Sequence, residues 1–483
     1  MSDKIRAGAL ARKGLLSAEA CIAGEALLRR AATADLETIR ILFADQHGVL
    51  RGKTLVAAAL PSVFTSGIAV PSTLLLKDTS HRTVFPVWSD QPGVLPGPVQ
   101  GVGDVLLVPD PSTFRVLPWS CHSAWIFCDV VHRDGTPIAY ASRSVLKSAV
   151  NRLAKAGMAA TIGLEVEFHI FERTDAAPDH AQTTMPGAPP QTRALTHGYQ
   201  FLTETRYSDA EPILDHLRRM AQGLDLPVRS VEIEMGPSQF EFTFDPAPPL
   251  RHADNLMMFR TMVKEVCAAR GLHASFMAKP RLDNIAACGW HIHQSLTDIT
   301  TGQAVFIPAR PEQLTPHAEH WIAGLLTHAR ASSLLIAPTV NSYKRYRPCQ
   351  LAPTRIQWGQ DNRGAMIRAL MAPDDPASRI ENRAPDTSAN PYYALAAQLI
   401  AGLDGIENDL IPPPPTRTPY HGDAARLPTN LAEAIEAFDH STLYRQVLGD
   451  ETVDYLVKIK RFEWERYLSA ISEWEQAEYF SLF

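Results

Sequence analysis

Apolar and polar residues alternate without exception over residues 161–170 of the chain. The polar positions of this segment hold Gly163, Glu165, Glu167 and His169, and every position between them is apolar. Successive side chains of a β-strand point to opposite faces, so the pattern predicts a strand that presents both carboxylates on one face. A single strand of this kind is most often a half-exposed strand with a solvated charged face.

Three further segments repeat the pattern with the same kinds of residue. They cover residues 230–244, which a Gly-Pro pair interrupts, residues 289–296 and residues 379–383. Their polar positions hold Glu232, Glu234, Glu241, His291, His293, Ser295, Arg379, Glu381 and Arg383. Solvent-facing strands usually mix Lys, Thr and Ser among their acids, so four such strands predict one shared functional site.

The residue types in these strands indicate a hard metal ion. Several carboxylates with one or two imidazoles and no thiolate suit Mg²⁺ or Mn²⁺ better than zinc. Arginines beside such a cluster suit a transferring phosphoryl group, because metal and guanidinium together neutralise its charge.

The rest of the chain predicts an α+β fold. Residues 15–30 favour a helical arm, residues 142–157 and 253–270 carry apolar stripes at helical spacing, and Asn390 followed by Pro391 starts another helix. Residues 38–45 and 49–56 predict two strands of a small N-terminal sheet. Helices and strands alternate irregularly, which argues against a doubly wound sheet.

Composition limits the class of protein. The 483 residues allow two or three domains, and a net charge of −6 argues against a nucleic-acid partner. The six cysteines form no C-x-x-C pair, which is typical of a reducing cytosol. No signal peptide and no apolar run of about 18 residues is found, so we expect a cytoplasmic protein without membrane segments.

Several motifs resemble a known family. In chain order they read GLEVEF, EMGPSQFEF, FMAKP, HIHQSL, NSYKR, NRGAMIR, RIENR and NPYYALAAQLIAGLDGI. This order and spacing resemble the glutamine synthetase family, from about Thr38 to the C-terminus. The resemblance implies ATP-dependent ligation, in which the side-chain carboxylate of glutamate is phosphorylated and an amine displaces the phosphate.

The resemblance also implies the architecture. We expect a helical arm over residues 1–35, a small β-grasp domain over 36–131, and a large catalytic domain over 132–483 with a curved antiparallel sheet and flanking helices. We further expect a homo-oligomer of two stacked hexameric rings, with each active site shared between neighbouring subunits.

Roles follow from positions that match the family motifs. Glu167, Glu234 and Glu241 are expected to hold one divalent ion, and Glu165, His291 and Glu381 another, in a site with two to three ions. A non-catalytic relative would have little reason to keep six such ligands where they repel one another without metal. The other matching residues are Arg345 for the glutamate α-carboxylate, Arg383 near the γ-carboxylate, Arg363 for the transferring phosphoryl group, and His293, Ser295 and Arg368 for ATP.

The chain departs from glutamine synthetase where the amine should bind. The family has a Glu, which helps to bind ammonium and remove its proton, where this chain has Leu351, and the small-domain segment 68–73 lacks the family's second acid, although Asp78 lies nearby. Ala287 stands in place of a Gly in the glutamate pocket, and Trp290 precedes His291. An amine that is already neutral, such as an aromatic amine, would need no base and would suit Leu351 and Trp290.

The sequence therefore predicts a ligase that joins glutamate to an apolar or aromatic primary amine, resembling the γ-glutamyl-anilide and γ-glutamyl-alkylamide synthetases. Three alternatives remain open: a γ-glutamyl-polyamine or γ-glutamyl-ethanolamine synthetase, a true glutamine synthetase, and a non-catalytic scaffold of this fold.

Overall fold

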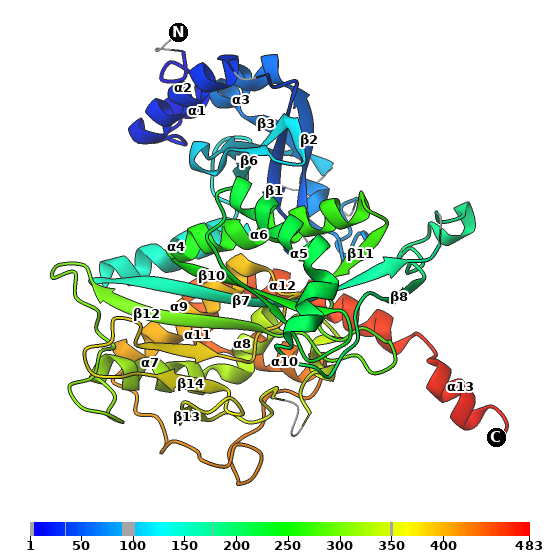
Figure 1. Ribbon diagram of the computed structural model, residues 1–483. Coiled ribbons are helices and arrows are strands. Elements are labelled where there is room, and N and C mark those ends of the chain that lie inside the picture. The colour runs from blue at the N-terminus through cyan, green and yellow to red at the C-terminus, as the bar shows by residue number, and fades with distance from the viewer. Residues whose placement is uncertain (1–3, 34, 89–101, 176, 348–350) are drawn as a thin grey trace.

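The computed structural model describes residues 4–33, 35–88, 102–175, 177–347 and 351–483. Two sheets with flanking helices make up the chain, so the predicted α+β class is confirmed (Figure 1). The N-terminal helices and the smaller sheet lie at one end of the molecule, and the C-terminal helix projects from its other end (Figure 1). The predicted domain boundaries at 35/36 and 131/132 stay predictions.

The smaller sheet has six strands. Its order is β2 (Leu50–Val56), β1 (Thr38–Ala44), β6 (Ser120–His132), β4 (Asp104–Pro109) and β3 (Ile68–Pro71), and β5 (Arg115–Leu117) pairs with β6. Strands β1 and β6 are parallel, and the other pairs are antiparallel. The two strands that the sequence predicted in this region are confirmed as β1 and β2.

The larger sheet has nine strands and contains all four predicted carboxylate segments. Its order is β13 (Trp358–Gln360), β14 (Ile367–Leu370), β15 (Arg379–Asn382), β12 (Trp290–Asp298), β7 (Met158–Arg173), β10 (Gln239–Ala247) and β9 (Val228–Ile233), with β8 (Thr192–Ala194) and β11 (Leu272–Ser275) pairing to β7. Only β13 and β14 run parallel among these described strands. The carboxylate strands are therefore direct neighbours in one sheet.

Thirteen helices are present within the described residues. They are α1 (Ala9–Arg12), α2 (Ala18–Thr33), α3 (Leu60–Ser66), α4 (Ser142–Lys155), α5 (Glu204–Gly223), α6 (Pro249–Ala268), α7 (Pro316–Thr327), α8 (Ala329–Ile336), α9 (Pro391–Glu407), α10 (Leu431–Asp439), α11 (Thr442–Leu448), α12 (Asp450–Leu468) and α13 (Glu473–Tyr479). The four predicted helices are confirmed as α2, α4, α6 and α9. The Asn390 side chain caps α9 by accepting a hydrogen bond from the backbone N–H of Tyr392. No helix of this set has the length and apolar character needed to cross a membrane.

The apolar face of the larger sheet packs on helices α4 and α6. The alternating residues of β7, among them Val166 and Phe168, are fully buried, and the Phe168 ring lies 5.7 Å from the Phe259 ring of α6. Burying a side chain of this size contributes about 1.5–3 kcal/mol. This packing fixes the face of the sheet that carries the acids, because the two faces alternate residue by residue.

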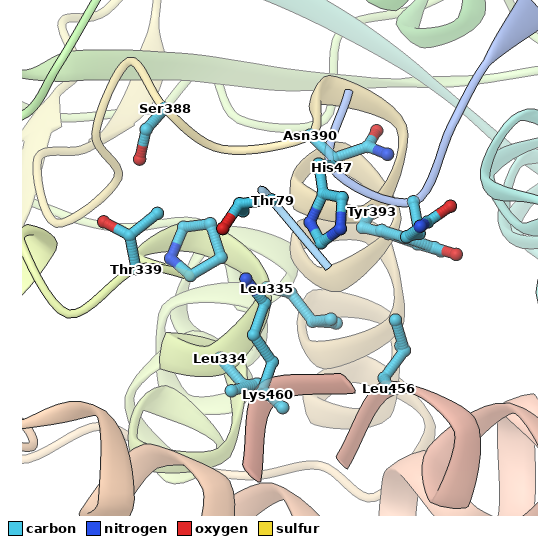
Figure 2. Close-up of a pocket in the computed structure, with 12 residues that line it drawn as sticks. His47, Thr79, Leu334, Leu335, Thr339, Ser388, Asn390, Tyr393, Leu456 and Lys460 are labelled. Carbon is cyan, nitrogen blue, oxygen red and sulfur yellow. The ribbon is translucent and has the colours of Figure 1, made fainter. Parts of the chain in front are cut away.

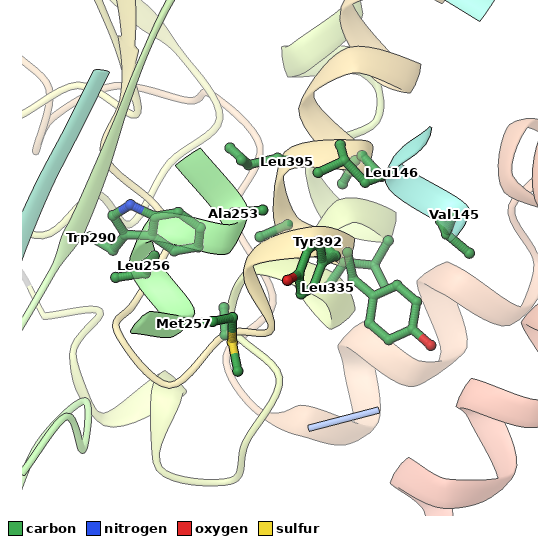
Figure 3. Close-up of a cluster of buried hydrophobic side chains, with 14 of the residues drawn as sticks. Val145, Leu146, Ala253, Leu256, Met257, Trp290, Leu335, Tyr392 and Leu395 are labelled. Atoms are coloured by element: carbon green, nitrogen blue, oxygen red, sulfur yellow. The ribbon is translucent and has the colours of Figure 1, made fainter. Parts of the chain in front are cut away.

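Trp290 lies in this core, so the prediction that it lines the amine pocket is wrong. Its strand position is paired with Val166, which puts the indole on the apolar face, whereas His291 is paired with Glu165 on the polar face. The indole is fully buried near Ala253 and Leu256 of α6 (Figure 3). A substrate on the polar face has the whole sheet between itself and this side chain.

A buried arginine joins the two sheets. The Arg143 guanidinium on α4 binds Asp129 of β6 at 2.8 Å, Asp110 at 2.7 Å, and Asp254 of α6 at 2.9 Å. The hydroxyl of Tyr392 on α9 also donates to Asp254. Burial alone would lower the pKa of Arg143, but the three carboxylates outweigh burial and raise it.

A second junction between the sheets encloses a small cavity of about 60 Å³. His47, from the turn between β1 and β2, faces Tyr393 of α9 and Lys460 of α12 across it (Figure 2). The side-chain amide of Asn390 donates to the carbonyl of Asp45 at 2.9 Å, which ties the turn to α9. The small sheet is therefore fixed to the helices that underlie the large sheet at two separate places.

We expect Arg143→Met to lower the free energy of unfolding by about 3–5 kcal/mol, because the buried Asp254 and the partly buried Asp110 and Asp129 would lose their shared cation. Arg152→Met is the matched control, since Arg152 lies on the same helix in a half-exposed pair with Glu407 and should cost less than about 1 kcal/mol. Denaturant unfolding of both variants measures the difference. Equal losses in the two variants would contradict the role of Arg143.

Candidate active site

The strand register gathers the predicted ligands on the polar face of the larger sheet. Glu241 of β10 lies opposite Glu167 of β7, and His291 of β12 lies opposite Glu165. On the next strand Glu381 of β15 lies opposite His293. Opposed residues of an antiparallel pair share a face with Cβ atoms about 4.5–5.5 Å apart, which brings acids from distant parts of the sequence into contact distance.

Three groups of side chains have ligand atoms within 4.8 Å of one another. They are Glu167, Glu234 and Glu241; Glu165, Glu241 and His291; and Glu165, His293 and Glu381. The first group is the set predicted for one ion. The predicted second set, Glu165, His291 and Glu381, is also close, since His291 Nδ1 lies 3.0 Å from Glu165 and 3.7 Å from Glu381. His293 shares this region, although the sequence assigned it to ATP.

The acids near β10 disfavour one another's charged forms. Burial, followed by the neighbouring Glu167 carboxylate, raises the pKa of Glu234 to about 8. The same two causes raise the pKa of Glu241 well above its ordinary value. Buried carboxylates that repel one another and carry only oxygen donors fit a divalent cation such as Mg²⁺ or Mn²⁺, which would replace the protons that these groups retain.

The acids near β15 are compensated by the protein itself. Burial would raise the pKa of Glu381, but Arg383 beside it, with His291 and His293, lowers the pKa instead. Both oxygens of Glu381 are held by arginines, since Arg383 binds Oε1 and Arg368 binds Oε2 at 3.0 Å. Arg368 therefore lies against a predicted metal ligand.

The tautomer of His293 follows from its two partners. The Nε–H of Arg379 donates to His293 Nδ1 at 3.0 Å, so this nitrogen carries the lone pair. His293 Nε2 then carries the proton and donates to Glu165 Oε1 at 2.7 Å. Burial would raise the pKa of Glu165, but hydrogen bonds from His291 and His293 outweigh it and lower the pKa.

Arg345 is placed by the turn that follows α8. It is 2 % exposed, and its Nη1 donates to the carbonyls of Ala384 at 2.9 Å and Pro385 at 3.0 Å. A Cβ atom on Gly289 would lie 3.0 Å from Arg345 Nη2 and 2.9 Å from His291 Nε2. The arginine, the imidazole and Glu167 thus converge on Gly289, where only a glycine leaves space.

The other predicted site residues are more scattered. Ser295 follows His293 on the same face of β12. The carbonyl of Ala287 accepts a hydrogen bond from Gln239 Nε2. Arg363 is exposed in the turn between β13 and β14. Leu351 is 51 % exposed with a φ of 55°, next to the undescribed residues 348–350. The structure therefore does not bring Leu351 into the buried cluster.

The Asp78 side chain stabilises the loop that follows β3 in the small sheet. Its side chain is fully buried, its Oδ1 accepts from the backbone N–H groups of Ser80 and Arg82, and its Oδ2 lies 3.3 Å from Arg466 of α12. These partners leave the carboxylate unable to turn toward an amine. Asp78 does not supply the missing acid.

Sequence reasoning missed Gly289 and Gln239 and gave Arg379 no role. Period-two alternation places Gln239 on the same face as Glu241. The face that Gln239 occupies could therefore be predicted from the sequence, but its hydrogen-bond partners could not. The role of Gly289 depends on the distance to Arg345, 56 residues later, and carries no local signal. Arg379 stood in a recognised strand, but its bond to His293 requires the β12–β15 register.

We expect divalent metal affinity to rise as the pH rises toward about 8, by up to about tenfold per pH unit, because the metal must displace the proton of Glu234. In the metal-free protein this proton contributes stability that is present below pH 4.5 and is lost as the pH rises through about 8. Calorimetric Mn²⁺ titrations at several pH values, in buffers of different ionisation enthalpy, measure both affinity and proton release. Glu234→Gln is the control, and affinity that does not change with pH would contradict the prediction.

Comparison with known proteins places the chain in a family. The family model described as "Glutamine synthetase, catalytic domain" matches residues 139–479. Gamma-glutamylanilide synthase of Acinetobacter sp is 37 % identical over 92 % of this chain and 93 % of its own length, and gamma-glutamylethanolamide synthetase of Streptomyces coelicolor is 34 % identical over 92 % of each. The solved structure of ligand-free GmaS superposes with a TM-score of 0.78 at 29 % identity, covering 94 % of this chain and 99 % of that one. The chain belongs to the glutamine synthetase family.

Proposed function

We propose that this protein is an ATP-dependent ligase that joins the γ-carboxylate of glutamate to a non-ammonia primary amine, aniline-like or isopropylamine-like in character. The observation that carries the proposal is a contrast between two sets of positions in the sequence. The acids, imidazoles and arginines of phosphoryl transfer are complete, whereas the acid that ammonium would need is replaced by Leu351. The similarity to gamma-glutamylanilide synthase supports the same conclusion.

The proposed reaction has two steps. A γ-carboxylate oxygen of glutamate attacks the terminal phosphorus of ATP, which breaks its bond to ADP and forms γ-glutamyl phosphate. The amine nitrogen then attacks the carbonyl carbon, phosphate leaves, and the nitrogen loses one proton. Two to three Mg²⁺ or Mn²⁺ ions, held by Glu165, Glu167, Glu234, Glu241, His291 and Glu381, would neutralise phosphate charge when bound.

The residues of the chain have separate roles in this proposal. Arg345 would hold the glutamate α-carboxylate, for which its rigid anchoring to two carbonyls suits it. Arg383 would lie by the γ-carboxylate and Arg363 by the transferring phosphoryl group, where guanidinium charge stabilises the transition state. His293, Ser295 and Arg368 would contact ATP, and Ala287 would border glutamate.

The nature of the amine follows from proton chemistry. An alkylamine with a pKa of about 10.4 must lose a proton before it attacks, which costs roughly 4.6 kcal/mol at pH 7 without a base. An aromatic amine is already neutral at that pH and avoids this cost. Isopropylamine would meet the cost, so the proton argument favours the aromatic member of the proposed class, and isopropylamine is included for its apolar shape. Asp78 is fully buried beside Arg466 and is not exposed to act as the base, and Leu351 would offer an apolar contact in place of a charge. The buried position of Trp290 removes it from this argument.

A second candidate is a γ-glutamylethanolamine synthetase. The Streptomyces coelicolor relative favours it, since its similarity extends over the same share of this chain. An ethanolamine or polyamine site would need acids to compensate the charged amine, and neither Leu351 nor segment 68–73 supplies one. A true glutamine synthetase has the same difficulty, and the complete ligand set disfavours a non-catalytic scaffold.

We also propose a cytoplasmic homo-oligomer of two stacked hexameric rings, with active sites between neighbouring subunits. The five cysteines in the described residues are all free, which fits a reducing compartment. The C-terminal segment exposes large apolar side chains, including Trp474, Phe480 and Leu482, which a neighbouring subunit could cover.

We expect phosphate release from ATP, with Mg²⁺ and glutamate present, to be stimulated strongly by aniline or isopropylamine and to stay near background with ammonium. The panel should include ethanolamine and putrescine, and omission of glutamate is the control. Ammonium as the best amine would contradict the proposed substrate class. Phosphate release that no amine stimulates would favour the alternative of a non-catalytic scaffold.

We expect Leu351→Glu to raise the ratio of kcat/KM for ammonium to kcat/KM for aniline by at least about tenfold, because a carboxylate would bind the ammonium charge and accept its proton. Glutamine has nearly the same shape as glutamate but no charge, so Leu351→Gln should leave this ratio close to that of the wild type. The measurement is the same phosphate assay with both amines. Equal effects of the two variants would show that residue 351 does not act through charge.

A further inference from the structure

We propose that Gln239 is a positioning residue, whose side-chain amide leaves Glu167 a single oxygen for metal and couples the metal ligands to the glutamate-binding segment 286–289. The inference rests on the proposed function, because it assumes that Glu167 binds a divalent ion. Gln239 is the first residue of β10 and is 1 % exposed.

The hydrogen bonds of this amide converge on the site. Its Nε2 donates to Glu167 Oε2 at 3.0 Å and to the carbonyl of Ala287 at 2.9 Å, and Cys288 Sγ lies 3.5 Å from the same nitrogen. Its Oε1 accepts from the backbone N–H of Gly236 at 2.8 Å. One buried side chain therefore binds three segments that are separate in sequence.

These bonds determine which oxygen of Glu167 is free. Oε2 receives Gln239 and also the backbone N–H of Gly289, at 2.8 Å. Oε1 lies on the side of His291, 3.9 Å from His291 Nε2. Glu167 also has a carboxylate oxygen within 4.8 Å of ligand atoms of Glu234 and Glu241. Glu167 would thus bind an ion through Oε1 alone, in an orientation that Gln239 and Gly289 hold.

The same residue also positions Glu234. The backbone carbonyl of Gln239 accepts from the N–H of Glu234 at 3.0 Å, which closes the hairpin between β9 and β10. A Cβ atom on Gly236 would lie 2.7 Å from Gln239 Oε1 and 2.9 Å from Ala286, so the amide is tightly enclosed. A movement of Gln239 would therefore shift Glu234, Glu167 and the segment beside Arg345 together.

No other side chain meets these requirements. Glutamate has the same shape but offers no N–H to Glu167 and adds a like charge. Leucine keeps the volume and removes all three hydrogen bonds. Both substitutions remove one of the two hydrogen bonds that hold Glu167 Oε2, leave the bond from Gly289, and do not change the charge of Glu167.

The test is Mn²⁺ binding to the metal-free protein, followed by electron paramagnetic resonance of the free ion. We expect Gln239→Leu and Gln239→Glu to weaken Mn²⁺ binding about 10- to 100-fold, which is typical when a partner of a metal ligand is lost. In the phosphate assay, the KM values for Mn²⁺ and glutamate should rise together, while the KM for ATP stays within about twofold.

Gln294→Leu is the matched control. Gln294 is also 1 % exposed and lies on β12, but its amide bonds Gln398 and Trp321 on the core side of the sheet. This variant should lose stability without losing Mn²⁺ affinity. Mn²⁺ affinity within twofold of the wild type in both Gln239 variants, or an equal loss in Gln294→Leu, would overturn the inference and leave the proposed function intact. Failure of the wild-type protein to bind Mn²⁺ would overturn both.

Discussion

Repulsion between carboxylates is the constraint around which the rest of this structure is arranged. Five glutamates from neighbouring strands meet on one face of a sheet whose other face is packed against helices, so they have no room to separate. Charges this close destabilise a folded protein unless cations or protons compensate them. The fold supplies part of that compensation and leaves the remainder to bound ions.

The acids that the protein itself compensates and the acids that it does not compensate lie on opposite sides of β7. Toward β15, Arg368 and Arg383 neutralise Glu381, and hydrogen bonds from His291 and His293 stabilise the Glu165 carboxylate. Toward β9, Glu234 and Glu241 meet other acids and lack a comparable cation. On one side of β7 the acids are thus paired with groups of the protein. On the other side, where Glu167 faces Glu234 and Glu241, a divalent ion would be needed to compensate them. A divalent ion on that side would lie near Arg345, because Glu167 and Arg345 both approach Gly289.

The sequence predicted the parts of the site that depend on local alternation. Strands β7, β10, β12 and β15 and their acids could be identified because residue spacing alone sets which face a side chain occupies. Trp290 was misplaced because its residue type, rather than its position in that alternation, was given weight. Gln239 and Gly289 were not found, because their roles require the register between strands and the approach of a loop 50 residues away. The burial of Asp78 likewise depends on its contact with Arg466, nearly 390 residues later in the sequence.

The partners of Arg143 lie far apart in the sequence, so the ribosome makes them at different times. Asp129 and Asp110 precede Arg143 by 14 and 33 residues, but Asp254 follows it by 111. At about 5–20 residues per second, the ribosome would deliver Asp254 roughly 6–22 s after Arg143. Arg143 and its two partners from the small sheet are therefore all synthesised before Asp254, and this part of the network needs no later residue. The partners on α6 and α9 are the last to be made.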